Sequence, residues 1–291
     1  MKSHVLLPVV SAVLLVALAC QTVSARAQDS AAISRELPSP CQTAASKSID
    51  TGTIGVVLMH GKRGTPRGSI RKLGDYLKRQ GFKVQMPEMP WSKSRQYDRT
   101  FEEAMEEIDR AVERLRNDGA THIVVGGWSQ GSTASLGYGA RRSGLAGIIV
   151  IAGGGDPYNI YQWKKKKFGA SVAKARQMVA AGKGDERAKF ADVKKGRVVT
   201  ARTTARIYLS YFDPKGPAFM PRNAAELQGG APLLWIYGRD DPLRKTNDPD
   251  YAFAKAPTNP LNAYVVIASG HMDAPEKGRQ VVGRWLKCLV E

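Results

Sequence analysis

The segment Gly127-Trp128-Ser129-Gln130-Gly131 constrains the chain more than any other feature. It follows a β-branched run at residues 122–126, which predicts a short buried strand, and it precedes residues 132–138, which can begin a helix. The two glycines let that strand and helix approach closely, because no side chain stands between them. The pattern therefore predicts a tight strand–turn–helix that holds Ser129 out at the end of a sheet. The alternative interpretation is a tight turn without any chemical role.

Apolar runs, and one segment of alternating apolar and polar residues at 82–86, recur along the chain and are separated by segments with helical spacing. The predicted strands cover residues 53–59, 82–86, 122–126, 147–151, 232–237 and 262–267. Helices are expected after Ser69 as far as Gly81, over residues 100–119 behind a capping box of Thr100 and Glu103, and over residues 278–289. Near-continuous apolar strands that alternate with amphipathic helices predict an α/β fold, with a mostly parallel sheet covered by helices on both faces.

Residues 1–27 have the pattern of a cleaved secretory signal peptide. Lys2 precedes an apolar stretch from Val5 to Ala19, and Ala25-Arg26-Ala27 supplies small residues at a cleavage site. The stretch is shorter than the roughly twenty residues of a membrane span, which disfavours an anchor. Lipoprotein processing at Cys20 is a further alternative. This segment predicts a periplasmic or secreted protein.

Removal of the signal peptide would leave two cysteines, Cys41 and Cys288. Two cysteines in an oxidising compartment suggest one disulfide, and two free thiols are the alternative. Residues 28–52 are polar and are predicted to be an irregular lead-in, whereas residues 53–291 are expected to form the folded domain.

The chain is strongly basic, with a formal charge of +18. Such a charge attracts acidic partners, which include anionic envelope surfaces, nucleic acid and acidic substrates. Between Gly155 and Arg206 there are fourteen Lys or Arg against four Asp or Glu. No strong strand is apparent in residues 157–228, and helical spacing extends over residues 172–180 and 186–193. A basic helical insertion is expected there. No nucleic-acid motif is present, so specific nucleic-acid binding is not expected.

A serine hydroxyl becomes a good nucleophile only with a base in hydrogen-bond reach and a carboxylate that orients the base. The chain beyond residue 27 has three histidines. His60 begins a glycine-containing loop, and His122 lies at the beginning of a predicted strand, away from the carboxyl end of that strand. His271 follows the last predicted strand, at the edge where Ser129 is expected, because the carboxyl ends of parallel strands share one edge. His271 is therefore the expected base for Ser129.

With these residues in this order, the sequence resembles the α/β-hydrolase superfamily over residues 53–289. The resemblance rests on the segment around Ser129, on His60-Gly61 after the first strand, on Asp241 in a Gly-x-x-Asp-Pro loop after the penultimate strand, and on His271. It differs from common members at Trp128 and in lacking early strands before residue 53, which indicates a reduced core.

The resemblance implies a catalytic triad of Ser129, His271 and Asp241. Asp240, next to Asp241, is the alternative acid, and Asp156 is a more distant one. It further implies that the backbone N–H groups of Lys62 and Gln130 form an oxyanion hole. The insertion at residues 157–228 would be a cap over the site, or alternatively a solvated helical excursion without contact to substrate.

The function implied by the resemblance is that of an exported serine hydrolase. It would cleave a carboxylic ester or related acyl bond of a small molecule through an acyl-enzyme, without a metal or organic cofactor. The alternative is a non-catalytic binding protein on a hydrolase scaffold, whose basic cap holds anionic envelope material. Weak association with anionic envelope surfaces is expected in either case, and no sequence feature specifies the oligomeric state.

Overall fold

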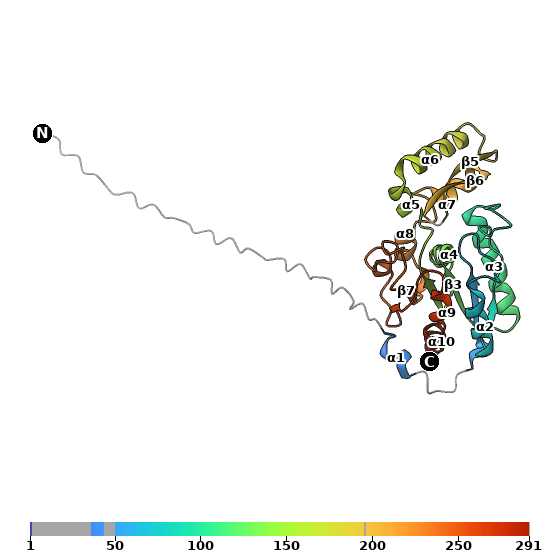
Figure 1. Ribbon diagram of the computed structural model, residues 1–291. Coiled ribbons are helices and arrows are strands. Elements are labelled where there is room, and N and C mark those ends of the chain that lie inside the picture. The colour runs from blue at the N-terminus through green and yellow to red at the C-terminus, as the bar shows by residue number, and fades with distance from the viewer. Residues whose placement is uncertain (2–35, 44–49, 195, 291) are drawn as a thin grey trace. The chain divides into compact units, whose positions relative to one another are not determined.

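A computed structural model of the chain (Figure 1) describes Met1 and residues 36–43, 50–194 and 196–290. Residues 1–30 and 31–291 are separate units, and every element below belongs to the second. Apart from Met1, the predicted signal peptide lies outside the described residues. Among the residues that the structure describes, no helix is long and apolar enough to cross a membrane.

The second unit is built on a six-stranded sheet in which every neighbouring pair is parallel. In sheet order the strands are β2 (Lys83–Gln85), β1 (Ile54–Met59), β3 (His122–Trp128), β4 (Gly147–Ile151), β7 (Leu233–Gly238) and β8 (Ala263–Ile267). Every residue of β1 and β4 is buried, as expected for strands covered on both faces. The predicted α/β fold with a parallel sheet is confirmed, and no strand before β1 is present in the described lead-in residues.

Alternate residues of each strand face opposite layers of helices. Val57 and Met59 of β1 pack with α3 (Phe101–Asn117), whereas Val56 and Leu58 pack with α2 (Arg71–Arg79) and α10 (Arg279–Cys288). The helix α4 (Gln130–Gly139) packs against β3 and β4 together with α8 (Met220–Ala225). The short α9 (Ala274–Lys277) contacts α2 and α10.

The helix α3 begins as the sequence predicts. The Thr100 side chain accepts a hydrogen bond from the Glu103 N–H, and the Glu103 carboxylate accepts one from the Thr100 N–H. These reciprocal bonds satisfy two backbone donors that a helix N-terminus otherwise leaves open. The capping-box prediction is confirmed.

The insertion, defined as residues 157–228, contains α5 (Pro157–Trp163), α6 (Lys165–Ala180), β5 (Arg187–Lys194), β6 (Arg197–Thr204), α7 (Ala205–Phe212) and α8. β5 and β6 form an antiparallel hairpin, so the expectation of helix over residues 186–193 is wrong. Inward Phe190 and Asp192 alternate with more exposed neighbours, and the Val- and Thr-rich β6 supplies a partner strand. Gly196, with φ of 75°, makes the turn.

The insertion is attached to the main sheet domain through aromatic side chains of α7. The Tyr211 ring lies 5.6 Å from that of Phe101, at the start of α3, and 4.8 Å from that of Tyr97. The Phe101 N–H donates to the Ser210 hydroxyl at 2.9 Å. In Figure 1 the hairpin and α6 lie together beside α7, at the top of the view.

A disulfide joins Cys41 to Cys288, with 4.9 Å between their Cα atoms. The pairing prediction is confirmed. Cys41 lies in α1 (Ser39–Thr43), so the described part of the lead-in is not wholly irregular. This short helix contacts α10, and the bond fixes the lead-in to the last helix.

Candidate active site

Ser129 lies at the sharp turn between β3 and α4. Its backbone has φ of 56° and ψ of −115°, a conformation that non-glycine residues rarely adopt. A Cβ added to Gly127 would lie 2.3 Å from the carbonyl carbon of Gly131, and one added to Gly131 would lie 2.4 Å from the Met59 oxygen. Neither position can therefore carry a side chain. The Ser129 N–H donates to Ile151 O at 3.0 Å, which holds the turn against β4.

A continuous chain of hydrogen bonds connects Ser129, His271 and Asp241. His271 Nε2 lies 3.1 Å from Ser129 Oγ, and His271 Nδ1 lies 2.8 Å from Asp241 Oδ2. The Asp241 side chain is fully buried, and its Oδ1 accepts the Leu243 N–H at 2.8 Å. Because both oxygens of Asp241 accept hydrogen bonds, this carboxylate is fixed toward His271. The histidine side chain is 18% exposed and so remains open to a substrate.

The two alternative acids lie in other surroundings. Asp240 is exposed, and its carboxylate makes no hydrogen bond to His271. Asp156 is buried at the start of α5, where it accepts hydrogen bonds from the Asn159 N–H, the Met220 N–H and the Tyr251 hydroxyl. Burial raises the pKa of Asp156. Asp156 thus anchors the beginning of the insertion rather than facing the histidine.

The loop after β1 is held from both sides. His60 Nε2 accepts the Met89 N–H at 3.0 Å, so Nδ1 carries the proton and donates to Gly61 O at 2.8 Å. Burial lowers the pKa of His60, which keeps the ring neutral. Trp91 is fully buried and donates its indole N–H to His60 O at 2.8 Å. Both side chains therefore support the loop.

The structure places this loop directly beside Ser129. A Cβ on Gly61 would lie 3.1 Å from Ser129 Cβ and 2.8 Å from the Trp128 ring. Among the described residues, the backbone N–H groups of Lys62 and Gln130 donate to no protein acceptor. Donors that stay open next to the serine can bind the oxygen of a developing oxyanion.

The Lys62 side chain makes a contact that the sequence does not reveal. Its Nζ lies 2.7 Å from Asp192 Oδ1 in β5 of the insertion. The Asp192 side chain is only 4% exposed and that of Lys62 is 17% exposed, so water has little access to this ion pair. The pair ties the loop beside Ser129 to the hairpin of the insertion.

The loop after β4 approaches the reacting atoms closely. A Cβ on Gly154, which follows β4, would lie 3.1 Å from Ser129 Oγ, so the backbone of this loop approaches the serine closely. Leu243 and Met272 are large apolar side chains with 37% and 63% exposure, close in sequence to Asp241 and His271. In the sequence, the close approach of the loop after β4 is indicated only by the three consecutive glycines at residues 153–155, directly after a predicted strand. Trp128 donates its indole N–H to His271 O at 2.8 Å and steadies the histidine loop.

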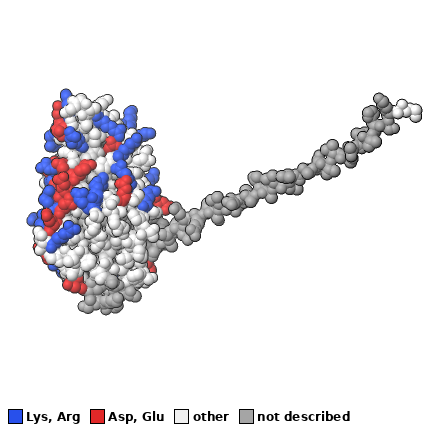
Figure 2. Space-filling view, turned by 180° about the vertical axis from the view of Figure 1, so that it is seen from behind, with Lys and Arg blue, Asp and Glu red and all other residues white. Residues whose placement is uncertain are grey.

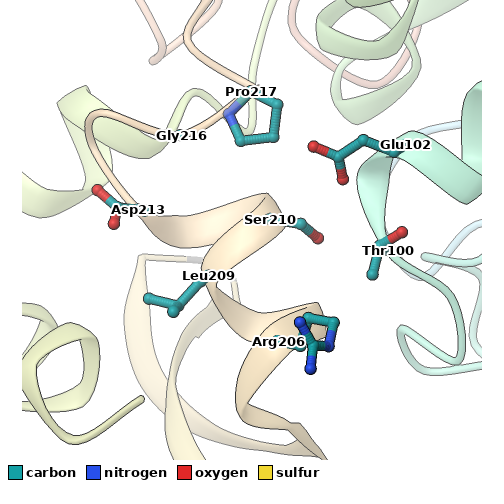
Figure 3. A pocket seen from close by; sticks show the side chains of 8 residues that line it. All are labelled: Thr100, Glu102, Arg206, Leu209, Ser210, Asp213, Gly216 and Pro217. Carbon is teal, nitrogen blue, oxygen red and sulfur yellow. The ribbon is translucent and has the colours of Figure 1, made fainter. Parts of the chain in front are cut away.

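Two pockets lie in the insertion or at its edge. One, of about 630 Å³, is lined by α5, α6 and the segment after α7, including Tyr161 and Phe219. The other, of about 420 Å³, lies between α7 and the start of α3; Figure 3 shows Ser210 and Thr100 on its opposite walls. Neither lining includes Ser129 or its hydrogen-bonded partners, so neither is assigned as the reaction site. Among the described residues, no group of three or more His, Cys, Asp or Glu side chains could hold a metal ion.

No protein-family model matches the chain, and no curated protein matches it in sequence. Solved structures are similar in fold. An α/β hydrolase, GrgF, from Penicillium sp. sh18 has a TM-score of 0.61 at 12% identity, covering 81% of this chain and 88% of that one. A metagenome-derived lipolytic enzyme of the LipS and LipT pair has a TM-score of 0.55 at 17% identity, covering 81% and 92%. An esterase from Pyrococcus furiosus has a TM-score of 0.54 at 16% identity, covering 82% and 83%. At sequence identities this low, the structural similarity shows a shared fold and nothing more specific.

Proposed function

We propose that this chain, which has the α/β-hydrolase fold, is a serine hydrolase that cleaves a carboxylic ester or related acyl bond. The observation that carries the proposal is the hydrogen-bond chain from Ser129 through His271 to the buried Asp241. These three residues follow three different strands, and a protein without catalytic use for them has no need of all three in contact. Neighbours in fold that are described as a lipolytic enzyme and an esterase support an ester substrate.

In the proposed mechanism, Ser129 Oγ attacks the acyl carbon while its proton passes to His271 Nε2. Asp241 accepts the Nδ1–H throughout, which holds the ring in the right tautomer and stabilises the imidazolium. The N–H groups of Lys62 and Gln130 would bind the oxyanion. His271 then returns the proton to the leaving alcohol, and a water molecule releases the acid from the acyl-enzyme by the same steps in reverse order.

The test is labelling of the protein with a fluorophosphonate probe, which reacts with activated serines. The wild type should label stoichiometrically, and Ser129→Ala should not label and should lose on the order of 10³-fold or more in kcat/KM on an aryl ester. Ser135→Ala is a matched control, because Ser135 lies in α4, the helix that follows Ser129, and its hydroxyl donates to Gly131 O instead of to the candidate triad. The control should label normally, with unchanged circular dichroism.

Absence of labelling in folded wild-type protein would contradict the proposal. It would favour the alternative, a binding protein that uses the basic insertion to hold anionic material. Full activity in Ser129→Ala would show that another residue is the nucleophile.

We also propose that the protein is exported. Disulfides persist mainly in oxidising compartments, and Cys41–Cys288 is one. The predicted signal peptide agrees with this compartment. N-terminal sequencing of the protein from the periplasm or medium should begin after Ala27; recovery of the full-length chain from the cytoplasm would contradict export.

A further inference from the structure

The insertion holds much of the positive charge of the chain. Residues 157–228 contain sixteen Lys or Arg and five Asp or Glu. Most of the described basic side chains among them are exposed. On the face shown in Figure 2, Lys and Arg are spread over the upper part of the molecule, interspersed with Asp and Glu, while much of the described lower part is white. A charge imbalance of this kind on one segment needs a physical reason.

The basic charge gathers around one exposed tryptophan. Trp163 ends α5 and is 51% exposed, and Lys164 to Lys167 follow it directly. A Cβ on Gly196 would lie 3.9 Å from the Trp163 ring, so the turn of the β5–β6 hairpin lies beside the indole. That turn is flanked by the exposed Lys194 and Arg197. We call Trp163–Lys167, Lys194 and Arg197 the basic tip.

The basic tip contributes no ion pair to the described part of the fold, since none of Lys164–Lys167, Lys194 and Arg197 forms one there. Three of the lysines occupy the first turn of α6, which has no acidic residue and no side-chain cap. Positive charge at a helix N-terminus opposes the helix dipole. α3, by contrast, has a capping box and two glutamates there. Residues that lower the stability of their own helix in this way are expected at functional positions.

Trp163 differs from every other tryptophan of the chain. The remaining four are at most 6% exposed. Lys164 Nζ lies 4.5 Å from the centre of the Trp163 ring, so this exposed indole packs against a cation instead of in the core. An exposed indole beside a run of lysines matches a membrane interface, where the ring sits at headgroup level and lysines bind anionic lipids.

We propose that the basic tip docks the protein onto a lipid bilayer rich in anionic headgroups. Charge complementarity selects the anionic surface, and Trp163 supplies the apolar insertion. This inference goes beyond the proposed hydrolysis and does not depend on it. Duplex nucleic acid would use the cations alone, since its backbone offers no apolar phase for the exposed indole.

The first test is co-sedimentation with vesicles of phosphatidylcholine, with and without phosphatidylglycerol. The wild type should bind only the anionic vesicles. Each lysine near such a surface contributes roughly fivefold to partitioning, so replacing Lys164–Lys167 with Gln should weaken binding on the order of several hundredfold. The matched control replaces Lys78, Lys93, Lys245 and Lys255 with Gln. These four are exposed and free of ion pairs among the described residues, and their loss changes the net charge equally.

The second test uses the intrinsic fluorescence of Trp163. Binding to anionic vesicles should shift the emission to shorter wavelength and make it sensitive to brominated lipids, because the other tryptophans are buried. Trp163→Phe should abolish the shift. Both readouts are independent of activity, so a failed Ser129 labelling and a failed docking are distinguished.

Two results would overturn the inference. One is equal vesicle binding by the basic-tip variant and its control, which would mean that net charge alone attracts the protein. The other is tighter binding to mixed-sequence duplex DNA than to anionic vesicles at physiological salt, lost in the basic-tip variant. That outcome would assign the same cations to nucleic acid.

Discussion

Removing the Asp192 carboxylate should destabilise the protein considerably more than removing an exposed acid of the same insertion. Asp192 pairs with Lys62 at 2.7 Å, with side-chain exposures of 4% and 17%. Asp192→Asn leaves the lysine charged without its partner, while the amide oxygen can still accept the Val193 N–H. The substitution therefore isolates the charge.

The expected magnitude follows from the burial of this pair. Breaking a buried ion pair by removing one partner costs about 3–5 kcal/mol, and we expect the lower end, about 3 kcal/mol, because some water reaches Lys62. For a domain of this size, that corresponds to a decrease in Tm of roughly 6–12 °C. Differential scanning calorimetry measures it. Lys62→Met combined with Asp192→Leu should recover most of the loss, since no unpaired charge remains.

The matched control is Asp185→Asn in the same insertion. Asp185 pairs with Arg206 at 3.1 Å, but their side chains are 81% and 57% exposed, so no measurable shift in Tm is expected. Equal shifts for the two substitutions would refute the reasoning. If Lys62 also supplies an oxyanion donor, Asp192→Asn should lower kcat by about 10- to 100-fold with a smaller change in KM.

Three further outcomes are expected. Gly154→Val should abolish ester hydrolysis without unfolding the protein, because its side chain would fill the space 3.1 Å from Ser129 Oγ; wild-type kcat/KM would contradict this. The pKa of His60 in the folded protein lies below its ordinary value of 6.5, so the unfolded chain binds more protons than the folded one as pH falls through 6.5. The Tm should therefore decrease as pH falls through this range. The decrease should be less steep in His60→Gln. The double substitution of Cys41 and Cys288 by Ala opens a loop with a sequence separation of 247, so a loss of about 5 kcal/mol and roughly 10–20 °C in Tm is expected; a Tm unchanged by reduction would disagree.

Much of the sheet could be predicted because five of its six strands are mostly apolar. Near-continuous apolar residues predict burial on both faces, as a parallel sheet covered by helices requires. This pattern is found in β1, β3, β4, β7 and β8. The hairpin of the insertion was not predicted, because its short alternating segments also fit helical spacing over residues 186–193. The pairing of two strands depends on contacts that neither strand encodes alone.

The candidate site likewise has residues that the sequence predicts and contacts that it does not. Ser129, Asp241 and His271 could be placed at one edge of the sheet because each follows a strand, and parallel strands end together. The choice between Asp240 and Asp241 depends on which side chain faces the histidine in the folded protein, and the sequence does not determine that. The Lys62–Asp192 pair joins residues 130 positions apart, without any pattern that connects them.

The bond between Cys41 and Cys288 makes one covalent ring of the main sheet, the insertion and all three residues of the candidate triad. A protease that cuts an exposed turn inside this ring, such as the one at Gly182, opens the ring but releases no fragment. The two pieces stay linked and keep the packing that placed them. In the exported protein that we propose, the first cleavage event would then leave one molecule, distinguishable from the intact chain only after reduction.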